Sequence, residues 1–352
     1  MAKRLMKGAE AIGEAAIRAH CRAYFCYPIT PQTEVAEYLV RRMPEVDGVF
    51  LQAESELAAS NMLFGAAAAG ARVFTSSSSP GIALMSEAIS YIAAAELPTV
   101  FVNIMRCGPG LGGILPAQGD YLNATKGGGH GDYHCIVLAP ASVQEAVDLT
   151  MSAFELAETY RTPVFVLGDG LIGQMMEPVE FKEGVVNPPP ERPWATTGCK
   201  DRDPNLVKTL FLDPAALEVH NRKLAAKYRE IRANEVRFER YNMDSRPETV
   251  MVAYGTVARI CKTAIDFLKE KGHEVGLVRP ITLYPFPHEE LLAIARDEAT
   301  RNVLVVEMSN GQMLEDVERA TRFLKPISFF GRQGGIVPAP EEVVRELELL
   351  AS

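Results

Sequence analysis

The sequence predicts a doubly wound α/β domain followed by a smaller α/β domain. Two observations lead to this prediction: short apolar runs alternate with helical stretches in both halves of the chain, and a proline-rich segment separates the halves. Continuously apolar strands that alternate with helices are typical of a parallel sheet covered on both faces. The chain has 352 residues, which is long for one domain and ample for two hydrophobic cores.

The first domain is predicted at residues 1–187. Ala- and Glu-rich helical stretches, as at Ser55–Ala69 and Val143–Glu158, separate its strands. This alternation is the pattern of a doubly wound sheet. The predicted strands, all expected to be buried, are Ala23–Cys26, Gly48–Leu51, Arg72–Phe74, Thr99–Ile104, Cys135–Leu138 and Pro163–Leu167.

A connector is predicted at residues 188–247. It begins in Val186–Pro193, whose four prolines exclude a helix or a central strand. Leu217–Arg240 is then predicted as one long, highly charged helix, and its sparse apolar residues indicate a position on the surface.

The second domain is predicted at residues 248–352, a common domain size. Its predicted strands are Val250–Ala253, Val275–Val278, Val303–Val306 and Ile327–Phe330. Helical stretches begin at Val257, His288, Leu314 and Glu341.

The composition excludes several classes of protein. The net charge of −9 argues against nucleic acid and anionic membranes as partners, because both need clustered Lys and Arg. The most apolar region, Gly81–Met105, is interrupted by Glu87, Glu96 and Pro98, so it is predicted as a buried helix and strand and not as a membrane span. The first residues lack the apolar core of a secretory signal. We therefore expect a cytoplasmic protein.

The six cysteines are scattered, with no C-x-x-C pair and no iron–sulfur spacing. They are predicted to be reduced thiols. If the protein carries out redox chemistry, its electron carrier is expected to lie in another subunit.

Ligands of doubly wound sheets bind in the loops after the carboxyl ends of strands. The first such loop is Tyr27–Pro31, in which two prolines fix the backbone around Thr30. It fits a rigid turn in which Thr30 caps the next helix, a ligand-binding loop, or both.

The second and third loops carry polar groups at predicted helix starts. The second loop is Gln52–Ala59. Acids in the first turn of a helix often only favour the helix dipole. Glu56, however, precedes an apolar face, where a carboxyl group suits proton transfer. In the third, Thr75–Gly81, the serines either cap the helix or bind a polar ligand.

The fourth loop, Asn103–Gly113, places Arg106 at the end of an apolar strand beside many glycines. Arg106 is predicted either to bind a carboxylate or phosphate or to form a salt bridge with a nearby acid. Pro109 interrupts the glycines, so the loop does not fit a dinucleotide fingerprint.

Other motifs favour less specific interpretations. Lys126–Asp132 resembles a phosphate loop but lacks the required spacing. His130 and His134 fit catalytic groups, although surface loop histidines are commoner. Gly168–Gly170 begins like the motif that binds thiamine diphosphate and magnesium, but the required asparagine is missing from Pro193–Lys200, so a structural turn is predicted.

Taken together and in order, the four loops closely resemble the α subunit of 2-oxoacid:ferredoxin oxidoreductases. The similarity continues at Arg279–Pro287 and Gly331–Gly335, which resemble the family's transketolase C-terminal-like domain. The resemblance implies that the first domain is a thiamine-diphosphate-binding domain of the pyrimidine type. Within the family, Gln52–Ala59, Ser76–Gly81 and Gln118–Tyr121 are most similar to the branched-chain (3-methyl-2-oxobutanoate) type, and the 2-oxoglutarate type usually has an acid where this chain has Ser55.

The resemblance implies the roles of individual residues. Glu56 is expected to hydrogen-bond the pyrimidine ring as the catalytic acid, and Thr30 and Arg106 to hold the substrate carboxylate. Tyr27, Pro28, Thr30 and Ser79 are expected to line the cofactor with Glu56, and no metal ligand is expected in this chain.

The implied enzyme decarboxylates a 2-oxoacid, transfers the acyl group to coenzyme A and reduces ferredoxin. A β subunit is expected to hold the diphosphate, Mg²⁺ and a [4Fe-4S] cluster, with small γ or δ subunits beside it. The alternatives are a 2-oxoglutarate-specific α subunit, a non-redox thiamine-dependent transferase, and a non-catalytic scaffold.

Overall fold

A computed structural model describes residues 3–182 and 186–351. Its larger sheet has seven strands in the order β12-β6-β7-β5-β4-β2-β3, all parallel except β12, which pairs antiparallel with β6. The strands are β2 (Ala23–Cys26), β3 (Val49–Gln52), β4 (Val73–Ser77), β5 (Thr99–Met105), β6 (Ile136–Leu138), β7 (Pro163–Asp169) and β12 (Thr282–Tyr284).

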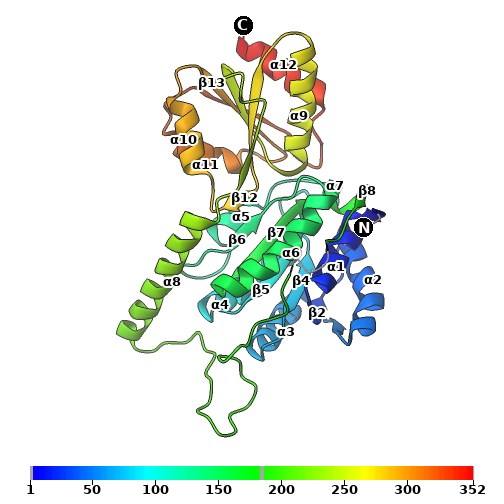
Figure 1. The fold of residues 1–352 in the computed structure, drawn as a ribbon, viewed down its shortest axis with the longest axis vertical. Coiled ribbons are helices and arrows are strands. Elements are labelled where there is room, and N and C mark those ends of the chain that lie inside the picture. The colour runs from blue at the N-terminus through cyan, green and yellow to red at the C-terminus, as the bar shows by residue number, and fades with distance from the viewer. Residues whose placement is uncertain (1–2, 183–185, 352) are drawn as a thin grey trace.

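Helices cover both faces of this sheet, as predicted for a doubly wound domain (Figure 1). Helix α1 packs against α6 and α2 on one face, and α3 packs against α4 on the other. The helices are α1 (Gly8–Arg18), α2 (Thr33–Arg42), α3 (Glu56–Ala68), α4 (Ser79–Ala94), α5 (Tyr121–Lys126), α6 (Val143–Tyr160) and α7 (Gly170–Gln174), with a 3₁₀ turn at Met43–Val46.

The second sheet has five strands in the order β14-β13-β10-β11-β9, and only β9 is antiparallel to its neighbour. Helices α9 and α12 pack together, as do α10 and α11. The elements are β9 (Phe238–Tyr241), β10 (Thr249–Val252), α9 (Gly255–Glu270), β11 (Val275–Pro280), α10 (His288–Arg296), β13 (Asn302–Glu307), α11 (Gln312–Thr321), β14 (Ile327–Gly331) and α12 (Pro340–Ala351).

The two sheets share a hydrophobic core. Buried residues of the first domain form one continuous cluster with Val252, Val305 and Val317 of the second. A separate cluster beneath α9 and α12 includes Val257 and Leu347. The second domain is therefore packed against the first rather than tethered to it.

The helix predicted at Leu217–Arg240 ends earlier than expected. Helix α8 spans Pro214–Asn234 and buries only Leu224, Tyr228 and Ile231, so it lies on the surface as predicted. The residues after it form β9, which pairs antiparallel with β11 at the edge of the second sheet and so takes its backbone hydrogen bonds from that strand.

Two other strands differ from expectation. The strand β12 follows β11 in the chain but completes the first sheet, and β3, predicted as buried, is an edge strand on which Val49 is 53% and Leu51 is 38% exposed. A small additional sheet pairs β1 (Arg4–Lys7) with β8 (Met176–Val179). No helix in the described part of the chain is long and apolar enough to cross a membrane.

Candidate functional site

The four loops singled out in the sequence follow neighbouring strands. In the sheet order β5-β4-β2-β3, Arg106 follows β5, Ser79 follows β4, Thr30 follows β2 and Glu56 follows β3. The carboxyl ends of parallel strands meet at one edge of the sheet. The fold therefore brings these four residues to the same edge.

Glu56 is the first residue of α3, and its side chain is buried. The helix start is fixed by Ser55, whose Oγ accepts from the N–H of Ala58 across 3.1 Å. Within the described residues, the Glu56 carboxylate has no hydrogen-bond or ion-pair partner. Glu54, by contrast, is exposed. The side chain is buried as a whole, yet its unpaired oxygens are not among the atoms fully closed off from solvent, so a ligand at this edge can reach them.

The main chain of Gly81 lies directly against the Glu56 carboxylate. A Cβ at Gly81 would come within 2.7 Å of Glu56 Oε1 and 2.1 Å of Ser77 Oγ. The hydroxyls of Ser77 and Ser78 are also buried without partners among the described residues. Ser78 precedes α4 but makes no side-chain capping bond, so the capping interpretation of this serine is wrong. Unsatisfied hydroxyls beside the Glu56 carboxylate fit the binding of a polar ligand.

Arg106 holds two loops by their main chains. Its Nη1 donates to the carbonyl oxygen of Thr30 across 2.9 Å, and its Nη2 donates to that of Leu111 across 3.0 Å. Arg106 is buried, and no acid of the described chain pairs with it. The predicted alternative of a salt bridge within this chain is therefore wrong.

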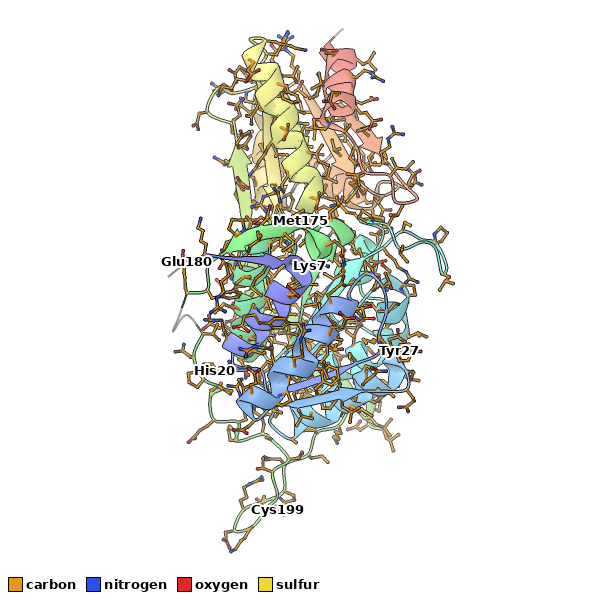
Figure 2. The ribbon with its side chains drawn as sticks, turned by 90° about the vertical axis from the view of Figure 1, so that its right-hand side faces the viewer. Lys7, His20, Tyr27, Met175, Glu180 and Cys199 are labelled. Carbon is orange, nitrogen blue, oxygen red and sulfur yellow. The ribbon has the colours of Figure 1, made fainter. Side chains whose placement is uncertain are left out.

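Hydrogen bonds among buried polar side chains hold the loop that contains Thr30 in place. Ser76 Oγ donates to Gln32 Oε1 across 2.6 Å, and Tyr24 OH lies 2.7 Å from the same hydroxyl. Because α2 begins at Thr33 after Gln32, Thr30 does not cap that helix. Thr30, Tyr27 and Pro28 are exposed, and Tyr27 lies at the surface of the first domain (Figure 2).

Ser79 joins this edge to a residue whose role the sequence analysis missed. Its Oγ lies 2.5 Å from Asp120 Oδ2 and accepts from the N–H of Arg106 across 3.0 Å. Burial raises the pKa of Asp120, while hydrogen bonds from Ser79 and Asn103 oppose that rise. The sequence analysis named Gln118–Tyr121 only for its similarity to the branched-chain type. It gave Asp120 no role, because nothing in the sequence pairs Asp120 with Ser79.

A cavity of about 570 Å³ opens between the two domains beside these residues. Ser79, Arg106 and Asp120 line it from the first domain, and Met308 and Gln333 are among its lining residues from the second. Glu56 and Thr30 do not line this cavity. The structure thus groups Arg106 with Ser79 in the cavity, and Glu56 with Gly81 beside it.

Gln118 links the first domain to the second beside the cavity. Its side-chain Nε2 donates to the carbonyl oxygen of Tyr254 and its Oε1 accepts from the N–H of Met308, each across 3.0 Å. Asp169 adds a second link, because its Oδ1 accepts from Thr256 Oγ1 across 2.9 Å and from the N–H groups of Leu171 and Ile172.

The remaining candidates have structural surroundings. His134 is half-buried and its ring stacks on that of Tyr284, with 4.4 Å between centroids. Burial lowers the pKa of His134, and the nearby Arg232 lowers it further. His130 is exposed on its loop. Cys199 is the only exposed cysteine and lies at the tip of the connector, far from the site (Figure 2).

The fold and site together define a protein with the thiamine-diphosphate enzyme architecture: a doubly wound domain with a buried acid at its carboxyl edge, and a smaller α/β domain packed on it. A split-gene transketolase shares the fold, with a TM-score of 0.59 at 13% identity over 98% of this chain and 97% of that one. That likeness shows the fold alone.

The chain belongs to the 2-oxoacid:ferredoxin oxidoreductase family. Residues 14–237 match the model "pyruvate flavodoxin/ferredoxin oxidoreductase, thiamine diphosphate-binding", and residues 247–343 match "pyruvate:ferredoxin oxidoreductase core domain II". The predicted family and fold class are confirmed, including the thiamine-diphosphate-binding character of the first domain.

Full-length relatives support a branched-chain type of subunit. The ketoisovalerate oxidoreductase subunit VorB of Methanothermobacter marburgensis is 47% identical over 100% of this chain and 99% of its own length. The 2-oxoglutarate synthase subunit KorA of Methanocaldococcus jannaschii is 35% identical over 97% of this chain and 98% of its own.

Among solved structures, 2-oxoglutarate:ferredoxin oxidoreductase from Magnetococcus marinus matches with a TM-score of 0.88 at 27% identity. The match covers 99% of this chain and 65% of that one, so this chain spans about two thirds of that solved chain.

Proposed function

We propose that this chain is the pyrimidine-binding subunit of an enzyme that oxidatively decarboxylates a branched-chain 2-oxoacid to an acyl-CoA and CO₂ while reducing ferredoxin. The observation that carries the proposal is the buried Glu56 carboxylate, which lies against Gly81 without a partner in the described chain. Its position at the carboxyl edge of the sheet suits a cofactor ring bound there.

When bound, thiamine diphosphate would supply a nucleophilic carbon and an electron sink for the decarboxylation. Glu56 holds a proton at the ring nitrogen of the pyrimidine, which activates the neighbouring amino group as a base. Tyr27 and Pro28 border the same ring from the exposed loop after β2. Ser79 also borders it, although its hydroxyl is already bonded to Asp120.

Arg106 and Thr30 hold the carboxylate of the substrate in this proposal. An arginine has five N–H donors, and two of those of Arg106 are used by the carbonyl oxygens of Thr30 and Leu111. Three N–H groups therefore remain: one on each terminal nitrogen, and that of Nε, which is buried without a partner among the described residues. A planar fork of two such donors matches a carboxylate.

Partner subunits complete the enzyme. Several relatives are named as subunits, which supports a multi-subunit complex. We assign the diphosphate, Mg²⁺ and [4Fe-4S] cluster to a β subunit, with small γ or δ subunits, coenzyme A and ferredoxin as further partners. Leu51, Leu57 and Leu111 are exposed on the β3 edge, the start of α3 and the glycine loop, and these apolar side chains suit a protein interface.

A 2-oxoglutarate enzyme is the second candidate, favoured by the TM-score of 0.88 to the 2-oxoglutarate:ferredoxin oxidoreductase. The cavity lining argues for the branched-chain substrate. Arg106 and Asp120 are the only charged side chains that line it in the described chain, so a second substrate carboxylate would meet no free cation there.

The function is tested with the native complex, isolated through an affinity tag on this chain. We expect coenzyme A-dependent reduction of ferredoxin with 3-methyl-2-oxobutanoate, at a kcat/KM about tenfold or more above that for 2-oxoglutarate. The reverse order would replace the branched-chain assignment by the second candidate. A complex that forms acyl products without reducing ferredoxin would indicate a non-redox transferase, and one that is inactive with both acids would indicate a scaffold.

A further inference from the structure

Asp120 occupies the capping position of a helix but does not cap it. The residue precedes α5, and its side chain accepts no hydrogen bond from that helix. Aspartate at this position normally accepts from the second or third N–H of its helix, which stabilises the helix start. Asp213 does so at the start of α8, where it accepts from the N–H of Ala215 across 3.0 Å. The Asp120 carboxylate is therefore used for something other than its own helix.

That carboxylate instead accepts two hydrogen bonds from other elements. Asp120 Oδ2 lies 2.5 Å from Ser79 Oγ and 2.9 Å from Asn103 Nδ2. The amide of Asn103 also accepts, through Oδ1, from the main-chain N–H of Ser79 across 3.1 Å. Three segments distant in sequence thus meet at one carboxylate.

The direction of these bonds leads to Arg106. The hydroxyl of Ser79 has one proton, and the carboxylate of Asp120 is its nearest acceptor; the carbonyl oxygen of Arg106 is farther away, at 3.3 Å. With its proton directed to Asp120, Ser79 Oγ presents a lone pair to the N–H of Arg106, 3.0 Å away. Asp120 thereby determines how Ser79 holds the main chain at Arg106, which also lines the cavity.

Stability alone gives no reason for a carboxylate at this place. Burial raises the pKa of Asp120, so the ionised form is disfavoured there before its hydrogen bonds are counted. Asp120 also lines the inter-domain cavity together with Ser79 and Arg106. A desolvated charge beside a binding cavity is more typical of a functional residue than of a structural one.

We propose that Asp120 is a positioning residue for substrate binding: through Ser79 it fixes the main chain of Arg106 and, with it, the guanidinium that binds the oxoacid carboxylate. This inference rests on the proposed function, because it assigns Arg106 to the substrate carboxylate. It adds a residue that acts on the substrate carboxylate through Ser79 and Arg106.

The test compares Asp120→Ala, Asp120→Asn, Ser79→Ala and the double variant Asp120→Ala/Ser79→Ala in the purified complex. Asp120→Ala should raise the KM for 3-methyl-2-oxobutanoate about tenfold while kcat stays within about threefold, as expected when ground and transition states lose the same interaction. Asp120→Asn keeps an acceptor oxygen and should rescue most of the KM. The double variant should be no worse than the poorer single variant, because both residues act in one chain of bonds.

Asp213→Ala is the matched control, since it removes an aspartate at an ordinary helix start and should leave the KM unchanged. Additive effects of Asp120→Ala and Ser79→Ala would overturn the proposal. So would a lowered melting temperature with an unchanged KM, or a fall in kcat that is equal for Asp120→Ala and Asp120→Asn. If wild-type complex is active and only the variant pattern fails, the proposed function stands; if wild-type complex accepts no 2-oxoacid, both proposals fall.

Discussion

Nη1 of Arg106 donates to the main-chain carbonyl oxygen of Thr30 across 2.9 Å. Arg106 follows β5 and Thr30 lies in the loop after β2, and the strand β4 separates those two strands in the sheet. The guanidinium therefore spans the end of β4 and ties together the two loops to which we assign the substrate carboxylate.

Arg106→Lys should lower kcat/KM for every 2-oxoacid by a similar factor, equivalent to about 2 kcal/mol or more. An ammonium offers no planar fork, so it cannot hold two carbonyl oxygens and a carboxylate in the same geometry. Steady-state rates with 3-methyl-2-oxobutanoate and 2-oxoglutarate check this, beside a melting curve of the complex. A loss confined to 2-oxoglutarate would show that Arg106 binds a distal carboxylate, and a loss of assembly alone would show a structural role.

Gly81→Ala should impair catalysis through Glu56. The new Cβ would lie 2.7 Å from Glu56 Oε1 and 2.1 Å from Ser77 Oγ, so both side chains must move. We expect activity to fall about tenfold or more, with a stability cost of about 1–3 kcal/mol. Gly65→Ala is the control, because nothing lies within 4 Å of a Cβ there and alanine favours the helix. Equal activities of the two variants would contradict the placement of Glu56.

Thr256→Val should weaken the junction of the two domains in a pH-dependent manner. Burial raises the pKa of Asp169, and the Thr256 hydroxyl is foremost among the hydrogen bonds that oppose the rise. A raised native pKa means that the stability contribution of Asp169 is full at low pH and is lost as the pH rises through that pKa. Without the hydroxyl the pKa rises further, so the variant should lose more stability at neutral pH than at acid pH.

Melting curves of Thr256→Val at about pH 5 and about pH 8 test this, with an expected loss of roughly 1–3 kcal/mol at the higher pH. Thr263→Val, on the same helix but exposed, serves as the control. A larger loss at the lower pH would mean that Asp169 is not the partner that matters.

The chain purified alone should bind no thiamine diphosphate tightly and carry no iron–sulfur chromophore. Its sequence lacks the asparagine of the diphosphate–magnesium motif and any clustered cysteines. Calorimetric titration of the isolated chain checks the first point and its visible spectrum the second. Micromolar affinity would contradict the assignment of the diphosphate site to a partner.

Sequence alone predicted the strands that bury both faces, because a short, continuously apolar run such as Thr99–Ile104 fits a strand covered on both sides. It did not predict β12, whose three residues lie between prolines and pair with a strand far away in the chain. The edge position of β3 was also missed, since the exposed apolar residues of an edge strand and the buried ones of a core look alike in sequence.

At the site, the sequence identified residues with distinctive chemistry, but it did not identify their hydrogen-bond partners. The loops of Glu56 and Arg106 were singled out because they follow strands. The partners of Arg106 are main-chain carbonyls, which every residue possesses, so no sequence pattern marks Thr30 or Leu111 as acceptors. The pairing of Asp120 with Ser79 likewise depends on how β4, β5 and α5 meet.

Proton exchange at the thiazolium carbon in the intact complex measures directly whether Glu56 is the acid that activates thiamine diphosphate. Glu56→Gln should leave the complex assembled and slow this exchange by about a hundredfold or more, while the exposed Glu54→Gln should change it little. Equal effects of the two substitutions, or normal exchange in Glu56→Gln, would contradict the account.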